Sequence, residues 1–174
     1  MANLHNYHGR YCEAEFESTF LSYLEEAGWS YLAGSSLPRD SMRDVLYTDD
    51  MEFFLNRTNP DLTADEIQQI MDTVRLAGAE TDFATLHKVY DWIVNGNQFT
   101  PQAALPRMVN LIEFEDPEKN VFRAVNQFTV EYTNNRQTQT RRPDILLFVN
   151  GMPLSIIELK NPADKNATIY DAWV

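Results

Sequence analysis

This sequence predicts an α+β fold with a mixed β-sheet. In most of the first half of the chain, apolar residues recur at helical spacing. The second half is richer in β-branched and aromatic residues, which alternate in part with polar ones. Helices that precede strands along the chain favour an α+β or mixed-sheet domain. The length of 174 residues fits one globular domain.

Four helices are expected in the first half, each with an apolar face and a capping or stop residue. Thr63 and Glu66 have the spacing of a capping box, in which each residue hydrogen-bonds to the backbone of the other. Gly28 and Gly96 follow periodic segments, where glycine commonly ends a helix. The expected helices cover residues 13–27, 50–56, 63–77 and 81–94.

Four strands are expected in the second half, at residues 109–114, 121–132, 145–149 and 154–159. The polar run 134–142 is expected to form either a solvated loop or a strand extension. Two apolar runs flank Asn150-Gly151, a dipeptide typical of tight hairpin turns. The last two strands are therefore expected to form a hairpin.

Composition limits the partners and the location of the protein. Fourteen Lys and Arg against 26 Asp and Glu give a net charge of −12, so any DNA contact must depend on local features. The single cysteine, Cys12, has no internal disulfide partner, which favours a reducing compartment, and we expect the cytoplasm. No run approaches the roughly 18 apolar residues of a membrane span. Residues 1–12 are expected to form a flexible arm.

Charged residues gather at the open end of the predicted hairpin. Asp144 precedes its first strand, and Glu158 and Lys160 follow its second, two positions apart and so on one face. Paired carboxylates suit a hard divalent cation, and a nearby lysine suits the anion that such a metal activates. The alternative is a strand that simply becomes polar where it reaches solvent.

The register of the hairpin decides whether the two carboxylates can share a site. A regular two-residue loop at Asn150-Gly151 sets Asp144 opposite Ile157 and turns Glu158 to the other face. An odd-length loop or a β-bulge brings Asp144 and Glu158 to one face. We therefore predict one of these two devices, with the glycine in a left-handed conformation.

The sequence around these charges resembles the N-terminal nuclease region of the restriction (R) subunit of type I restriction-modification enzymes. The stretches that carry the resemblance are NQFTVEY, RRPDILLFVNGMPLSIIELKNPAD and KNAT, and the earlier helices fit more loosely. That family belongs to the PD-(D/E)xK nuclease superfamily. The resemblance implies a restriction-endonuclease-like fold, a mixed central β-sheet flanked by helices, over residues 13–174.

The resemblance also implies roles for individual residues. Pro143-Asp144 looks like the "PD" of the motif, and Glu158-Leu159-Lys160 looks like its "ExK". It implies Asp144 and Glu158 as Mg²⁺ ligands together with the backbone carbonyl of Leu159, and Mn²⁺ is expected to substitute. Lys160 would orient the attacking water and stabilise developing charge. The expected catalytic residues are thus Asp144, Glu158 and Lys160.

Glu17 is a further candidate metal ligand. It shares a helical face with the apolar residues Phe20 and Leu24, so it should point toward packed structure. Nucleases of this superfamily often place a helical glutamate near the metal, and Glu17 resembles it. The alternative is a surface salt bridge, and Glu13 and Glu15 are weaker candidates for the same role.

Basic and aromatic side chains give weaker signals of DNA binding. Arg136, Arg141 and Arg142 either contact phosphate near the site or only add charge to a solvated loop. Trp29 and Tyr31 are expected to pack in the core or at a helix end rather than to stack on bases.

The function implied by the resemblance is that of a type I site-specific deoxyribonuclease. This Mg²⁺-dependent endonuclease domain would cleave double-stranded DNA within an ATP-driven R subunit, alongside methylation and specificity subunits. The alternative is a non-catalytic docking domain of the same fold, in which the carboxylates and lysine form a structural ion-pair cluster.

Two departures from the family pattern suggest a truncated domain. The helix expected from Thr168 reaches Val174 before any Gln-x-x-x-Tyr motif, and the chain contains no Gly-x-x-x-x-Gly-Lys-Ser/Thr sequence. We therefore expect the chain to stop within its C-terminal helix and to cleave weakly or not at all as a fragment. ATP would act only through the absent translocase domain.

Overall fold

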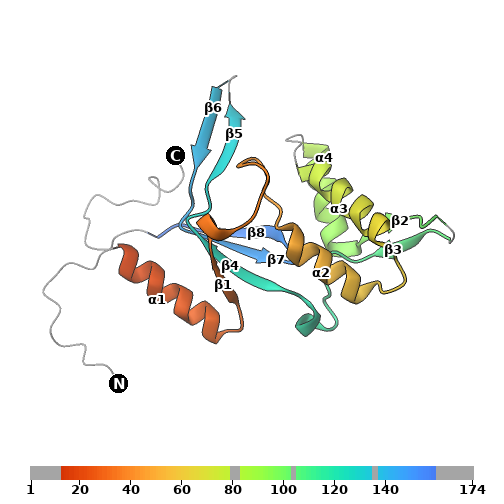
Figure 1. Cartoon of the computed structure of the whole chain (residues 1–174), viewed down its shortest axis with the longest axis horizontal. Helices are drawn as coiled ribbons and strands as arrows, with labels where there is room; N and C mark the ends of the chain where they lie inside the picture. The colour runs from red at the N-terminus through yellow and green to blue at the C-terminus, as the bar shows by residue number, and fades with distance from the viewer. Residues whose placement is uncertain (1–12, 79–82, 103–104, 135–136, 160–174) are drawn as a thin grey trace, which may run out of the picture.

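A computed structural model of the chain describes residues 13–78, 83–102, 105–134 and 137–159. Its centre is a four-stranded mixed sheet. The helix nearest the N-terminus lies against this sheet, and the three later helices are grouped away from it, past the ends of the strands (Figure 1). The predicted α+β class with a mixed sheet is therefore confirmed. Within these residues no helix combines the length and apolar character needed to cross a membrane.

The four predicted helices are confirmed to within two residues at each end. Thr63 and Glu66 form the expected capping box: the Thr63 amide donates to Glu66 Oε2 at 2.9 Å, and the Glu66 amide donates to Thr63 Oγ1 at 3.3 Å. Hydrogen bonds to the carboxylate, first from the Thr63 backbone, lower the pKa of Glu66. The helices are α1 (Glu13–Glu26), α2 (Thr48–Thr58), α3 (Ala64–Gly78) and α4 (Phe83–Asn95), with short 3₁₀ turns η1 (Gly34–Ser36) and η2 (Pro117–Lys119).

The main sheet has the strand order β1-β4-β7-β8. β1 runs parallel to β4, and the other neighbours are antiparallel. β2 pairs with β3, and β5 pairs with β6, as separate antiparallel pairs. The strands are β1 (Ser30–Ala33), β2 (Asn97–Phe99), β3 (Arg107–Val109), β4 (Phe122–Asn126), β5 (Val130–Asn134), β6 (Gln137–Arg141), β7 (Ile145–Val149) and β8 (Met152–Ile157).

Two strand predictions need correction, and one open alternative is decided. The strand expected at 109–114 is wrong, because β3 ends at Val109 and the following residues enter the core without strand pairing. The strand expected at 121–132 divides into β4 and β5, because Gln127 adopts a left-handed φ of 52° between them. Of the two readings of 134–142, the strand extension is confirmed by β6.

Strands β1 and β2 were not predicted. β1 has four residues and β2 has three, which is too short for a periodic pattern. Because β1 lies among the helices in sequence yet pairs in parallel with β4, the expected order of helices first and strands later is also incomplete.

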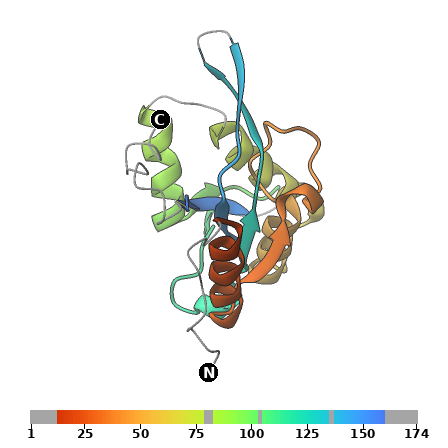
Figure 2. The same cartoon turned by 90° about the vertical axis from the view of Figure 1, so that its left-hand side faces the viewer.

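The β5–β6 pair forms a ribbon that projects from the sheet. Both views show it standing clear of the helices (Figures 1 and 2). All five residues of β6 are exposed, as their polar sequence demands. The ribbon begins and ends beside the open end of the β7–β8 hairpin, because β6 leads into β7 through residues 142–144.

The two faces of the sheet carry different cores, as alternation along each strand requires. Ile145 of β7 packs with Ala124 and Leu21 on the face that α1 covers. Leu146 and Phe148 pack on the other face, under the loop that joins η1 to α2. A third and larger cluster joins α2 and α3 to the turn end of the sheet.

Helix α4 leaves part of its predicted apolar face exposed. Phe83 is 82% exposed, and Leu86 and Tyr90 are more than half exposed. The expectation that these residues pack into a core is therefore wrong for the described part of the chain. Ile93, which belongs to the same predicted face, does contact the third cluster, and so does Trp92.

The Asn150-Gly151 turn is held by a buried polar network. Both residues are left-handed, with φ of 49° and 76°, which confirms the prediction for the glycine. The Asn150 side chain is 1% exposed, accepts from the Val121 amide at 2.7 Å and donates to the Leu111 carbonyl at 2.9 Å and to Asn120 Oδ1 at 2.8 Å. These bonds join the turn to the segment before β4.

The start of helix α2 is fixed to the same end of the sheet. The Tyr47 amide donates to the Gly151 carbonyl at 2.8 Å. Arg123 of β4 donates two hydrogen bonds of 2.6 Å to Asp50, which is buried, and these bonds raise the pKa of Arg123. The buried ion pair was not predicted, because nothing in the sequence brings residues 50 and 123 together.

We predict that Gly151→Ala destabilises the protein strongly. A Cβ at this position would collide with the Tyr47 carbonyl oxygen, and the positive φ adds backbone strain. The free energy of unfolding, measured by urea denaturation, should fall by more than about 2 kcal/mol. Gly28→Ala is the matched control: its φ is also positive, but open space surrounds it, so about 1 kcal/mol should be lost. Equal losses would contradict the packing described for the turn.

Candidate active site at the open end of the hairpin

A β-bulge sets the register of the β7–β8 hairpin. Next to the turn Val149 pairs with Met152, as a two-residue loop requires. The register then shifts, and Leu147 pairs with Ser155. Leu154 is the extra residue that this shift leaves unpaired. The prediction of an odd-length loop or a bulge is confirmed, and the bulge is the device present.

The shifted register puts the two candidate carboxylates on the same face of the hairpin by strand alternation. Ile145 pairs with Ile157 in the last pair of the hairpin, and the same offset continued by one residue would set Asp144 opposite Glu158. The Leu159 amide donates to Asp144 Oδ2 at 2.7 Å, so the ends of both strands remain in contact. Asp144 and Leu159 therefore meet at the open end of the hairpin, and Glu158 precedes Leu159 in the chain.

The two carboxylates differ in exposure. Asp144 is half-buried behind the buried Pro143, whereas Glu158 is exposed. Glu158 lines a cavity of about 540 Å³ between β8 and the base of the β5–β6 ribbon. Arg141 lines the same cavity and its Nε donates to the Tyr132 hydroxyl at 3.4 Å. The site is thus open on the Glu158 side.

Glu17 reaches the same region from helix α1. Its carboxylate is half-buried and accepts hydrogen bonds from Asn126 Nδ2 at 2.6 Å and from Gln127 Nε2 at 3.0 Å. The backbone amide of Gln127 donates to the backbone carbonyl of Asp144 at 2.9 Å. Glu17 is therefore linked to the backbone of Asp144 through Gln127. These partners are amides, so they are not the surface salt bridge considered from the sequence.

Sequence reasoning missed Asn126 and Gln127. Both lie in the stretch NQFTVEY, but as neutral amides they carry no signal of their own. Tyr31 was also misplaced, because it is exposed and its hydroxyl donates to Asn126 Oδ1 at 3.0 Å. Trp29 behaves as predicted and packs on Phe122 with the ring centroids 5.2 Å apart.

The donor set at the strand ends suits a hard cation. Two carboxylates and a backbone carbonyl supply the oxygen ligands that Mg²⁺ prefers. In the described part of the chain, no group of three or more His, Cys, Asp or Glu residues is placed to hold a metal ion. The pair Asp144 and Glu158 is therefore the core of the candidate site, and Glu17 as a metal ligand stays a prediction.

Several predicted features lie outside the described residues. These are Lys160, Arg136, the flexible arm at 1–12 and the helix expected from Thr168. Arg142 is described: it is exposed and lines a different cavity from Arg141, on the side of Asn126 and Gln127. The three arginines considered together from the sequence therefore do not form one described surface.

Comparison with known proteins identifies the family. The family described as "Type I restriction enzyme R protein N terminus" matches residues 10–174, and the chain belongs to it. No solved structure is significantly similar to the chain. The restriction-endonuclease-like fold therefore stays a prediction.

Two curated proteins match nearly the whole chain. A Methanocaldococcus jannaschii protein, named as a candidate endonuclease subunit of the type I restriction enzyme MjaIXP, is 34% identical over 168 residues, 90% of this chain. The type I restriction enzyme HindI endonuclease subunit of Haemophilus influenzae is 29% identical over 181 residues, 92% of this chain. The chain spans 16% of the length of each relative.

The contact between Asp144 and Leu159 gives a prediction for stability. Asp144→Ala removes the acceptor of the Leu159 amide and should lower the free energy of unfolding by about 1–2 kcal/mol. Asp144→Asn keeps an acceptor oxygen and should cost less than about 1 kcal/mol. Urea denaturation of both variants measures the difference. The same loss in both would mean that this hydrogen bond does not hold the strand ends together.

Proposed function

We propose that this domain is a Mg²⁺-dependent endonuclease that cleaves double-stranded DNA as part of a type I restriction enzyme. The observation that supports the proposal is the bulged register of β7 and β8, which pairs Ile145 with Ile157 and, continued by one residue, would set Asp144 opposite Glu158. A hairpin needs neither the bulge nor two opposed carboxylates for its stability. Like charges opposite each other on neighbouring strands are unfavourable, and a divalent cation bound by both would offset the repulsion.

Each residue has a chemical role in this proposal. Asp144, Glu158 and the Leu159 carbonyl would hold Mg²⁺, which when bound neutralises charge on the phosphate and promotes ionisation of water. The Leu159 amide orients Asp144 by its bond to Oδ2, which leaves Oδ1 for a ligand. Lys160 would orient the attacking water and stabilise the charge that develops on the phosphate. Glu17 would act from α1, where hydrogen bonds from the side chains of Asn126, at the end of β4, and of Gln127, just after it, hold its carboxylate.

The proposed partners follow from the family. Double-stranded DNA is the substrate, and the methylation and specificity subunits are the protein partners. ATP would act through the translocase of the complete R subunit and not through this domain. The net charge of −12 fits such a division, because a domain to which DNA is delivered needs little affinity of its own.

We predict that Mn²⁺ or Mg²⁺ raises the melting temperature of the chain. A ligand that binds only the folded state stabilises it, by about 2.7 kcal/mol at roughly 100 times its Kd. Asp144→Asn should abolish the shift, because it removes the charge yet retains the hydrogen-bond acceptor. Glu52→Gln, which removes an exposed carboxylate from α2, is the matched control and should keep the shift. Lys160→Ala should also keep it, since lysine acts on water and phosphate.

Cleavage by the assembled restriction enzyme tests the chemistry itself. Asp144→Asn and Lys160→Ala in the complete R subunit should each reduce plasmid cleavage by about 100-fold or more, with ATP hydrolysis unchanged. Metal shifts that are equal in wild type and Asp144→Asn, together with normal cleavage, would support the docking-domain alternative.

A further inference from the structure

Arg39 is a partly buried arginine with one buried nitrogen that donates to no described residue. Two arginine nitrogens, Arg39 Nη1 and Arg107 Nε, are buried without a hydrogen-bond partner among the described residues. The Arg107 guanidinium is otherwise bound to Asp61 and Asn59, so its charge is compensated. In Arg39 the unpartnered buried atom is Nη1. A buried donor without a partner is costly, and a bound anion is one way to satisfy it.

The Arg39 guanidinium is held in place by stacking. Its central carbon lies 4.2 Å from the centroid of the Phe128 ring, and Phe128 is fully buried against Phe148. Burial lowers the pKa of Arg39, and the charge of Asp44 acts in the opposite direction. Arginine nevertheless remains protonated at neutral pH. The structure thus presents a fixed cation with free donor capacity.

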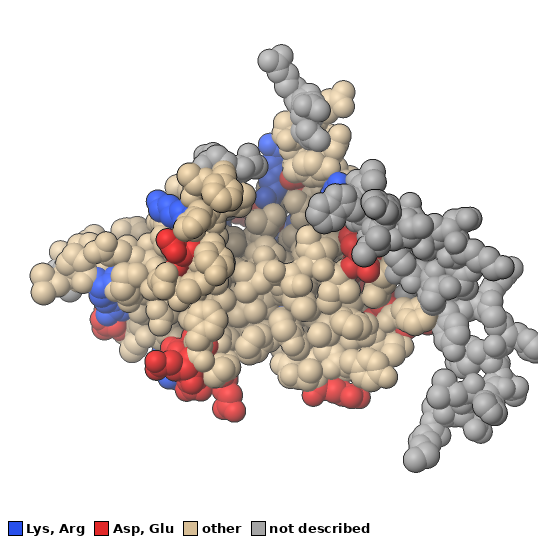
Figure 3. Space-filling model, turned by 180° about the vertical axis from the view of Figure 1, so that it is seen from behind, with Lys and Arg blue, Asp and Glu red and all other residues tan. Residues whose placement is uncertain are grey.

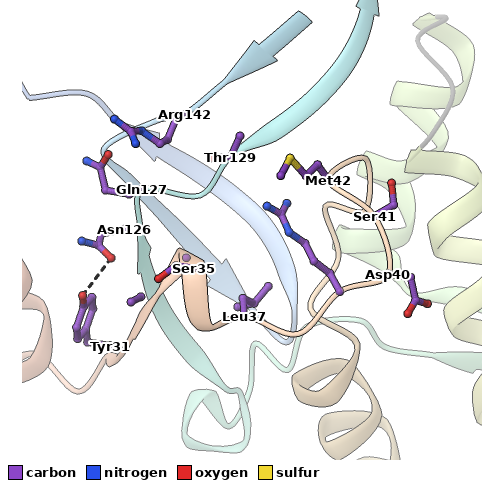
Figure 4. Close-up of a pocket in the computed structure, with 13 residues that line it drawn as sticks. Tyr31, Ser35, Leu37, Asp40, Ser41, Met42, Asn126, Gln127, Thr129 and Arg142 are labelled. Carbon is purple, nitrogen blue, oxygen red and sulfur yellow. Dashed lines mark hydrogen bonds between the residues drawn. The ribbon is translucent and has the colours of Figure 1, made fainter. Parts of the chain in front are cut away.

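This cation faces a polar cavity of about 640 Å³. Arg142 and Thr129 line one side of the cavity, and Ser41 lines the side opposite them (Figure 4). The Asp40 carboxylate also belongs to the wall, but it lies on the far side from Arg142 (Figure 4). Two arginines with surrounding hydroxyl and amide donors are a setting for an anion, and guanidinium groups match phosphate oxygens in particular.

The cavity adjoins the candidate active site. Asn126 and Gln127 line it, and the same two side chains bind Glu17. The Gln127 amide donates to the Asp144 carbonyl, and Arg142 precedes Asp144 by two residues. An anion in the cavity would therefore lie next to the group held by the proposed metal. A DNA strand supplies phosphates in such a series, whereas a single small anion would not link the two sites.

We propose that the cavity at Arg39 and Arg142 binds a backbone phosphate of the DNA strand, adjacent to the phosphate that is cleaved. This inference rests on the proposed nuclease function. It assigns a positioning role to Arg39, because holding a neighbouring phosphate fixes the register of the strand at Asp144 and Glu158. The overall acidity does not oppose a local contact: on the face in Figure 3, basic side chains lie along the ribbon and larger acidic groups along the opposite edge.

The test measures binding of a fluorescent DNA duplex to the chain by anisotropy, in EDTA and over a series of salt concentrations. Arg39→Met keeps an apolar side chain against Phe128 and removes the donors. It should weaken binding about tenfold, as loss of a charge-assisted contact does. The slope of log K against log salt should fall by about 0.9, the value for one phosphate contact.

Two further variants test whether the effect of Arg39→Met is specific to the cavity. Arg43→Met removes the same charge from an exposed arginine that does not line the cavity, and it should bind DNA nearly as wild type does. Arg142→Met changes an exposed lining residue, so it should weaken binding without affecting the fold. If Arg39→Met and Arg43→Met have equal affinities and slopes, or if Arg142→Met binds as wild type does, the proposal is overturned.

Inorganic phosphate distinguishes the source of the anion. DNA binding that depends on Arg39 supports the backbone assignment. Stabilisation of the chain by inorganic phosphate that depends on Arg39, with no Arg39-dependent DNA binding, would overturn it in favour of a free phosphate ligand. Because the DNA measurement contains no divalent metal, failure of the nuclease proposal would appear in cleavage alone, and failure of the phosphate site in the Arg39 comparison alone.

Discussion

The register of the β7–β8 hairpin is the constraint on which the site depends. The buried amide of Asn150 fixes one end of the hairpin to the segment before β4, and the bulge at Leu154 shifts the pairing before the other end is reached. Without that shift Asp144 would face Ile157, and the two carboxylates would lie on opposite faces of the sheet. A polar network at one end and one unpaired residue thus determine the chemistry possible at the other end.

The rest of the fold supports this hairpin from three sides. Helix α1 packs on one face, the loop after η1 packs on the other, and α2 and α3 cover the turn. Strand β4 lies beside β7 and ends at Asn126, and the left-handed backbone of Gln127 follows it next to Asp144. The ribbon leaves the sheet at this point, so the candidate site, Glu17 and the Arg39 cavity all surround the same strand ends.

Local sequence patterns predicted the helices and the hairpin, because capping boxes, stop glycines and an Asn-Gly turn act within a few residues. They could also show that Asp144 and Glu158 require a shift in register, because strand alternation has a fixed period. They could not reveal β1, which is too short for a pattern, or the pairing of Asp50 with Arg123 across the fold. Arg39 was missed for the same reason, since its surroundings come from three separate segments.

The most direct test of the account is the position of Mn²⁺ in crystals of the chain soaked with the ion, located by anomalous diffraction. The account predicts a peak between the carboxylates of Asp144 and Glu158, within coordination distance of both. A peak at other residues alone, or carboxylates that remain free of metal while Mn²⁺ is bound elsewhere, would contradict the claim that the bulged hairpin builds a metal site.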